Sequence, residues 1–334
     1  GILKHWAGNE IGSDVQGIRG RFALCTNNHF SYGVTQQAPK CPLCHADAKR
    51  QGDLMFPRHG FTTAAWDPPR WSTSVERVGS VEQATITFGQ GSEDIEENFG
   101  GIRGLRARHK EAGEILVYNE GEWDKGFAIC TKCGYADSEV NHGQGRMNLK
   151  KSFERHTPLS QTRGRCWNED SPPVLRNQTL AARQITDVLL LDVSDCKEPA
   201  FASKEDGETM AHTLARALQN AGARLLQVDS RELGVLVFPV GPSARFQAPV
   251  VFDNVPGGAG HVRELMGEGR AWLEAARDAL YVSKEHDLRC NRACLDCVLT
   301  FDAQTAMREG LIDRRMALAV LDRWLAQGVG AVEA

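Results

Sequence analysis

Closely spaced cysteines constrain this chain more than any other feature. They form two CxxC pairs and one run of three, namely Cys41–Cys44, Cys130–Cys133, and Cys290 with Cys294 and Cys297. Two thiolates on a short turn can hold one metal ion, and Gly134 supplies the glycine that such a turn favours. The sequence therefore predicts a protein shaped by zinc.

The composition narrows the class of protein further. The chain has 334 residues, enough for two domains, and its net charge of −4 gives no global attraction to nucleic acid. Any DNA contact would have to be a local basic patch. No apolar run approaches the ~20 residues of a membrane span, and there is no secretory signal. CxxC pairs in such a chain favour metal over disulfides, and a cytoplasmic location. Because Gly1 stands where an initiator Met would be, we expect a fragment of a longer protein.

The predicted elements change character along the chain. Short strands are expected first, at Arg21–Leu24, Ala84–Phe88, Glu114–Tyr118 and Gly126–Ile129. Beyond about residue 180, longer strands and helices alternate. The strands are expected at Ile185–Val193, Gly234–Val240 and Pro249–Asp253, and the helices at Glu208–Ala221, Val262–Leu280 and from the N-cap Asp313 to near Gly328.

This order predicts a mixed α+β and α/β fold. A β-rich, zinc-ribbon-like N-terminal half would precede an α/β domain with a C-terminal cysteine cluster. We expect a β-rich region over residues 1–115, a zinc-knuckle segment over 116–180, and the α/β domain over 181–334.

The second cysteine group gives the clearest metal site. Cys130 and Cys133 form one knuckle, and His156 with Cys166 is spaced as the second half of a Cys3His site. Four such ligands close a tetrahedral zinc site and leave no position for water, so the site would be structural. His142 is the competing imidazole, and His156 is preferred.

The other two groups lack an obvious fourth ligand. For Cys290, Cys294 and Cys297, His286 lies one helical turn upstream and Cys196 is a remote alternative; an iron–sulfur cluster is a further but less favoured interpretation. For Cys41 and Cys44, Cys25 is the third candidate. A zinc ribbon would carry a fourth cysteine where Asn28 stands, so His29 or His45 would have to substitute, and a metal-free ribbon is the alternative.

Charged runs and a glycine-rich turn offer other candidate chemistry. Two basic runs could hold a nucleic-acid backbone: Arg103, Arg106, Arg108, His109 and Lys110, and then Arg146, Lys150, Lys151 and Arg155. The acidic run Glu93–Glu97 is most simply a solvated face. The turn Pro256–His261 could bind phosphate through backbone N–H groups, or could only let a helix pack closely on a sheet, which is slightly favoured.

Enzymatic motifs are missing from the sequence. Asp192, Asp229, Glu232 and Asp253 end predicted strands, where a nuclease would hold Mg²⁺, but no nuclease spacing connects them. There is no Walker A motif, and we expect no ATP hydrolysis by this chain alone.

Several of these segments together resemble one family. They are Phe127–Tyr135 with His156 and Cys166, then Ile185–Leu191, Glu232–Gly234, Phe252–His261, the last cysteine cluster and Asp313–Arg315. This pattern, over about residues 120–330, resembles the helicase-associated zinc-binding C-terminal domain of MrfA-like DNA repair helicases, of the DISARM subunit DrmB and of the Druantia helicase. Family members usually have a fourth cysteine where this chain has Leu288, which strengthens the case for His286.

The resemblance implies an accessory role beside a superfamily 2 helicase motor, in the same polypeptide or in a partner. DNA, single-stranded or forked, is the expected partner, and the residues expected to contact it are Arg103, Arg106, Arg108, Lys110, Lys150, Lys151 and His261. The antiviral-defence or DNA-repair setting also comes from the resemblance. A metal-dependent nuclease and a protein-interaction scaffold without DNA contact are the alternatives.

Overall fold

The computed structural model describes most of the chain and divides it into two compact units. The described residues are 5–6, 19–27, 29–34, 40–41, 44–56, 61–62, 83–87, 93–121, 125–140, 149–156, 166–168, 170, 172–201, 203–241, 245–300 and 303–327. Unit 1 comprises residues 1–26, 30–84 and 116–183; unit 2 comprises 27–29, 85–115 and 184–334. His142, Asn28 and Arg146 lie outside the described residues.

Unit 1 is built on a β-sheet in which the strand order is β10, β9, β11, β4, β2 and β3. The first part of β11 runs parallel to β4 and antiparallel to β9, and the remaining pairs are antiparallel. These strands are β2 (Arg19–Cys25), β3 (Phe30–Tyr32), β4 (Ala48–Met55), β9 (Phe127–Cys130), β10 (Ala136–Ser138) and β11 (Val174–Asp192). A short pair, β1 (His5–Trp6) with β5 (Phe61–Thr62), and the helix α1 (Lys151–Glu154) complete it.

Unit 2 combines a β-sheet with helices. The second part of β11 pairs with β13, which pairs along its whole length with β12, while β8 pairs with β6, β7 and β11. The strands are β6 (Gln83–Thr87), β7 (Asp94–Glu97), β8 (Arg106–Asn119), β12 (Leu233–Val240) and β13 (Phe246–Asp253). The helices are α2 (Lys204–Leu226), α3 (His261–Glu268), α4 (Arg270–Leu280), α5 (Lys284–Arg289), α6 (Gln304–Arg308) and α7 (Arg314–Gln327).

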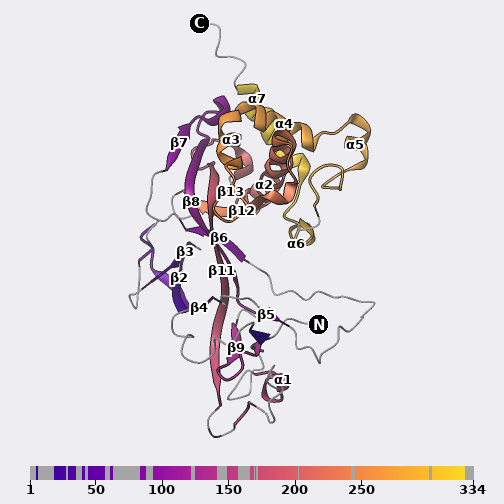
Figure 1. Ribbon diagram of the computed structural model, residues 1–334. Coiled ribbons are helices and arrows are strands. Elements are labelled where there is room, and N and C mark those ends of the chain that lie inside the picture. Colours follow the sequence, from indigo (N-terminus) through magenta and orange to yellow (C-terminus); the bar gives the residue numbers. More distant parts are fainter. Residues whose placement is uncertain are drawn as a thin grey trace. The chain divides into compact units, whose positions relative to one another are not determined.

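One large apolar core holds unit 2 together. α2 packs on β12 and β13, and also against α4, which in turn contacts α7. In Figure 1 these helices, salmon to yellow, lie together beside strands β8 and β13. Trp272 and Trp324 are among the largest buried side chains, and the Trp272 indole donates to the Leu218 carbonyl. Burial of such aromatic side chains makes this core the main source of stability in the unit.

The mixture of strands and helices that the sequence predicts is confirmed, with one clear difference. The predicted helix Val262–Leu280 is two helices, because Gly269 has φ 47° and ψ −108° and separates α3 from α4. A glycine tolerates this left-handed φ at little cost, so the chain turns there. The expected division at residues 115 and 180 stays a prediction. None of the described helices is long and apolar enough to cross a membrane.

Candidate metal centres

The second cysteine group converges on one point in unit 1. The ligand atoms of Cys130, Cys133, His156 and Cys166 all lie within 4.8 Å of one another. Cys130 ends β9, and the turn that follows closes through the Gly134 N–H to the Cys130 carbonyl, at 2.8 Å. Gly134 has φ +73°, which is why glycine suits this position. The knuckle geometry thus follows directly from the local sequence.

His156 is prepared to act as a ligand through one ring nitrogen. Its Nδ1 contacts the Phe153 carbonyl, which fixes the proton there, while Nε2 is buried and has no hydrogen-bond partner among the described residues. The ring stacks on Tyr135, with centroids 4.5 Å apart. A buried imidazole nitrogen beside three thiols is what a zinc ion would occupy, so these residues fit the metal.

Without a metal, the thiols of this knuckle influence each other's protonation. A hydrogen bond from Cys133 is the main reason why the pKa of Cys130 is lowered, and it raises the pKa of Cys133 in turn. Burial raises the pKa of Cys166. One thiolate is therefore already favoured, and metal binding must displace protons from the others.

The third cysteine group has the spacing of a tetrahedral zinc site. The Cys290 and Cys297 sulfurs are 3.9 Å apart, those of Cys294 and Cys297 are 3.7 Å apart, and His286 Nε2 lies 3.2 Å from the Cys294 sulfur. A Zn–S bond of about 2.3 Å in tetrahedral geometry places sulfurs about 3.8 Å apart. The structure brings together His286 and not Cys196, which lies outside this group.

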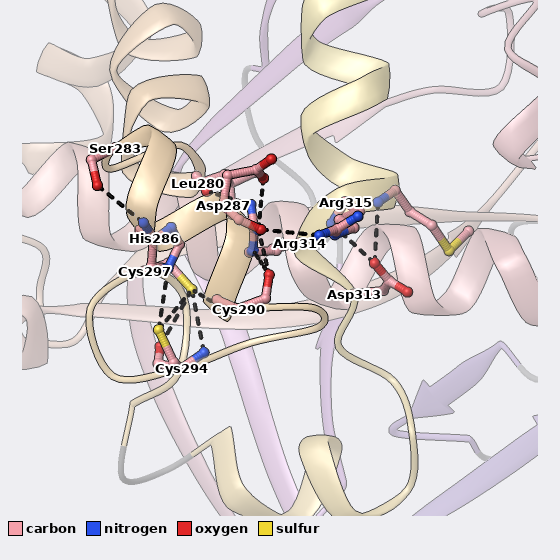
Figure 2. A network of polar contacts seen from close by, with 11 residues as sticks. Leu280, Ser283, His286, Asp287, Cys290, Cys294, Cys297, Asp313, Arg314 and Arg315 are labelled. Carbon is pink, nitrogen blue, oxygen red and sulfur yellow. Dashed lines mark hydrogen bonds and ion pairs between the residues drawn. The ribbon is translucent and has the colours of Figure 1, made fainter.

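A buried arginine supports the backbone of this third group (Figure 2). Arg314, at the start of α7, is 0% exposed and donates through Nε to the Cys290 carbonyl at 2.8 Å. It also donates to the Leu280 carbonyl and to both the carbonyl and the carboxylate of Asp287. A zinc ion with three thiolates and a neutral imidazole carries a net charge of −1. The positive Arg314 guanidinium would stabilise that charge. Sequence reasoning missed this role, although Arg314 belongs to the segment that carries the family resemblance.

The first cysteine group also gathers four ligands. Cys25, at the end of β2, has its sulfur 3.8 Å from that of Cys44, and the ligand atoms of Cys25, His29, Cys41 and Cys44 lie within 4.8 Å of one another. His29 is 3% exposed, whereas His45 is exposed and outside the group. Of the two imidazoles left open by the sequence, the structure thus places His29 with the thiols. No disulfide joins the ten cysteines, all of which are described.

Several of the residues predicted to contact DNA are buried or paired with acidic side chains. Arg106 lies on β8 and pairs with Asp192 and Asp195, Arg108 pairs with Glu93 at 2.9 Å, and Lys110 is 4% exposed. The acidic run and the basic run therefore meet, since β7 pairs with β8. Arg103 is exposed.

The remaining candidates belong to other segments of the sequence. Lys150 is 3.3 Å from Asp137 and His261 is 3.3 Å from Glu232, while the Lys151 side chain lies outside the described part of the structure. Their contribution to DNA binding stays a prediction.

The acids at strand ends serve the fold. The Asp253 carboxylate accepts the backbone N–H groups of Ala259, His261 and Val262 at 2.6–3.1 Å and so holds the glycine-rich turn at the start of α3. Gly258 in that turn has φ +78°, and a Cβ there would lie 2.7 Å from Asp187. Within the turn, the N–H groups of Ala259 and His261 thus already meet Asp253, and those of Gly257 and Gly258 donate to backbone carbonyls. Within the described ranges, the candidate metal-binding sets are the three Cys/His groups, and no cluster of acidic residues is among them.

Comparison with known proteins agrees with the zinc interpretation. Residues 214–298 match the family model of the MrfA Zn-binding domain, a span that contains His286 and the three cysteines of the third group. This segment is an MrfA-like zinc-binding domain. A crystal structure of the DUF1998 helicase MrfA bound to DNA is similar to the chain at a TM-score of 0.39 and 14% identity, over 73% of this chain and 25% of that one. The chain thus spans about a quarter of that helicase. No curated protein matches it.

The family match and the three Cys/His groups together identify Zn²⁺ as the cofactor. Each group offers four protein ligands, so a bound ion would have no open position for substrate or water. The zinc would therefore supply folding free energy and local geometry, because an unfolded chain has no preformed site.

Proposed function

We propose that this chain is a zinc-stabilised, DNA-engaging accessory region of a bacterial superfamily 2 helicase. It would act in the cytoplasm in phage defence or DNA repair, beside a motor in the same polypeptide or in a partner. The observation that carries the proposal is the MrfA-like zinc-binding domain at residues 214–298, whose third cysteine group is assembled and supported by Arg314.

The ligands that we assign to zinc are the three groups of four residues. They are Cys25, His29, Cys41 and Cys44; Cys130, Cys133, His156 and Cys166; and His286, Cys290, Cys294 and Cys297. The expected DNA partner is single-stranded or forked, because a helicase accessory region meets DNA where the motor opens it. No described feature favours the nuclease alternative, since the candidate acids are engaged by backbone N–H groups or basic side chains.

The test is binding of the purified chain to labelled single-stranded, forked and blunt duplex DNA at several salt concentrations. We expect binding that weakens steeply with salt, as phosphate contacts require, and preference for the single-stranded or forked probe. Absence of binding to all three at low salt would contradict DNA engagement. Mg²⁺-dependent plasmid cleavage by the same preparation would favour the nuclease alternative.

A further inference from the structure

A cavity of about 560 Å³ lies in unit 2, and none of the ligands of the three cysteine groups lines it. Its lining comes from the loop before β8, the segment after β11 and the last turns of α7, and includes Arg103, Asp195, Lys197, Glu198 and Trp324. Volumes of this size are typical of sites for small ligands or for part of a larger one. Neither the zinc sites nor the proposed helicase association explains this cavity.

Both acids of this cavity are paired with arginines outside its lining, one of which, Arg106, also pairs with Asp192. Asp195 accepts from Arg106 Nη2 at 2.7 Å. Glu198, which is buried, is held by two nitrogens of Arg323 at 2.5 and 3.2 Å. Charge-assisted bonds of this kind leave these carboxylates little capacity to bind a second cation.

The two cations of the lining are in the opposite situation. Arg103 and Lys197 are both exposed, and neither forms an ion pair or hydrogen bond with any residue in the described part of the chain. The buried Trp324 indole, stacked on Phe201, contributes apolar surface to the lining. Two cations that have no ion-pair partner in the described part of the chain can attract an anion to this cavity, and more strongly one with two charges than one with a single charge.

We propose that this cavity binds a phosphate group. The planar Arg103 guanidinium can bond two phosphate oxygens at once, and Lys197 adds a point charge. The phosphate would belong either to the backbone of a nucleic-acid strand or to a free nucleotide. The first source deepens the proposed function and rests on it, whereas the second stands without it.

The experiment compares the double variant Arg103→Ala/Lys197→Ala with the double variant Arg263→Ala/Lys204→Ala. The control removes the same two residue types from exposed positions of unit 2 outside the cavity lining. Both proteins should melt like the wild type, because all four side chains are exposed. The probes are a labelled oligothymidylate, whose binding is followed by anisotropy at several salt concentrations, and ATP and pyrophosphate, followed by calorimetry.

The cavity variant should bind at least one probe about tenfold or more weakly than the wild type, and the control within about twofold. Loss for the oligonucleotide alone, with a salt slope reduced by about 1–2, identifies a strand phosphate. Loss for ATP or pyrophosphate identifies a nucleotide, even if the chain binds no DNA and the proposed function fails. The proposal is overturned if the cavity variant matches the control with every probe, or if the wild type binds none of them.

Discussion

The two units depend on metal to different degrees. Among the residues of unit 1 that the structure describes, the buried apolar side chains form small separate clusters, and one of them is built around the knuckle from Ala128, Cys130, Tyr135, Phe153 and Cys166. In unit 2 a single large cluster joins the sheet and the helices and includes Cys290 and Cys297. Where the apolar core is small, a metal ion must supply the cohesion; where it is large, the metal fixes a loop on a body that is already stable.

The largest effect should come from removing a zinc ligand of unit 1. We expect Cys166→Ser to destabilise the protein by more than about 4 kcal/mol, because the knuckle has little apolar packing to replace the metal. Thermal unfolding and zinc content measure it. Cys196→Ala is the matched control: another buried cysteine, outside the three groups, which should keep all its zinc. A Cys166→Ser protein that melts like the wild type would contradict the claim that unit 1 depends on its metal for stability.

Arg314→Ala should have the next largest effect. It leaves the buried carbonyls of Cys290 and Leu280 without their donor, which should cost about 3 kcal/mol and weaken zinc retention against a chelator. The neighbouring Arg315→Ala removes an exposed side chain and should cost less than about 1 kcal/mol. Equal effects of the two substitutions would show that the buried guanidinium does not support the site.

Cys294→Ser should be milder than Cys166→Ser. Cys294 is only partly buried, and the core behind the third group persists without it. We expect a loss of one zinc and about 2 kcal/mol, with the helical circular dichroism signal retained. Loss of the helical signal in this variant would mean that unit 2 depends on metal as strongly as unit 1.

The smallest effect concerns how the stability of the protein depends on pH through His212 in α2. Burial, and then the charge of Arg216, lower the pKa of His212 from 6.5 to about 4. The unfolded chain therefore binds a proton more readily than the folded one below pH 6.5, so stability falls as the pH drops from 6.5 towards 4. Between pH 7 and pH 5, the free energy of unfolding should therefore fall by about 1 kcal/mol more in the wild type than in His212→Gln. Denaturant unfolding of both proteins at the two pH values measures this difference. Identical pH dependence of both proteins would contradict it.

Local signals in the sequence predicted much of this structure. Asp313 caps α7 as expected, since its carboxylate accepts the N–H groups of Arg315 and Met316. The continuous apolar run of β11 and the stripe of α2 were also visible, because burial imposes these patterns directly.

What the sequence did not reveal depends on contacts between distant segments. The basic run at Arg106 and Arg108 suggested a nucleic-acid contact. In the fold, however, Arg106 pairs with Asp192 and Asp195 from the end of β11, and Arg108 pairs with Glu93 next to β7, which lies beside β8. Nothing near Arg314 in the sequence indicates that its side chain is buried against Cys290, since that contact forms only when α7 packs beside the third group.

The metal content of the purified chain tests the central claim most directly. Elemental analysis together with native mass spectrometry counts the ions and identifies them. The three assembled groups of four ligands predict three zinc ions per chain, falling to two in Cys166→Ser and in Cys294→Ser. Two or fewer zinc ions in the wild-type chain, or iron in their place, would contradict the account.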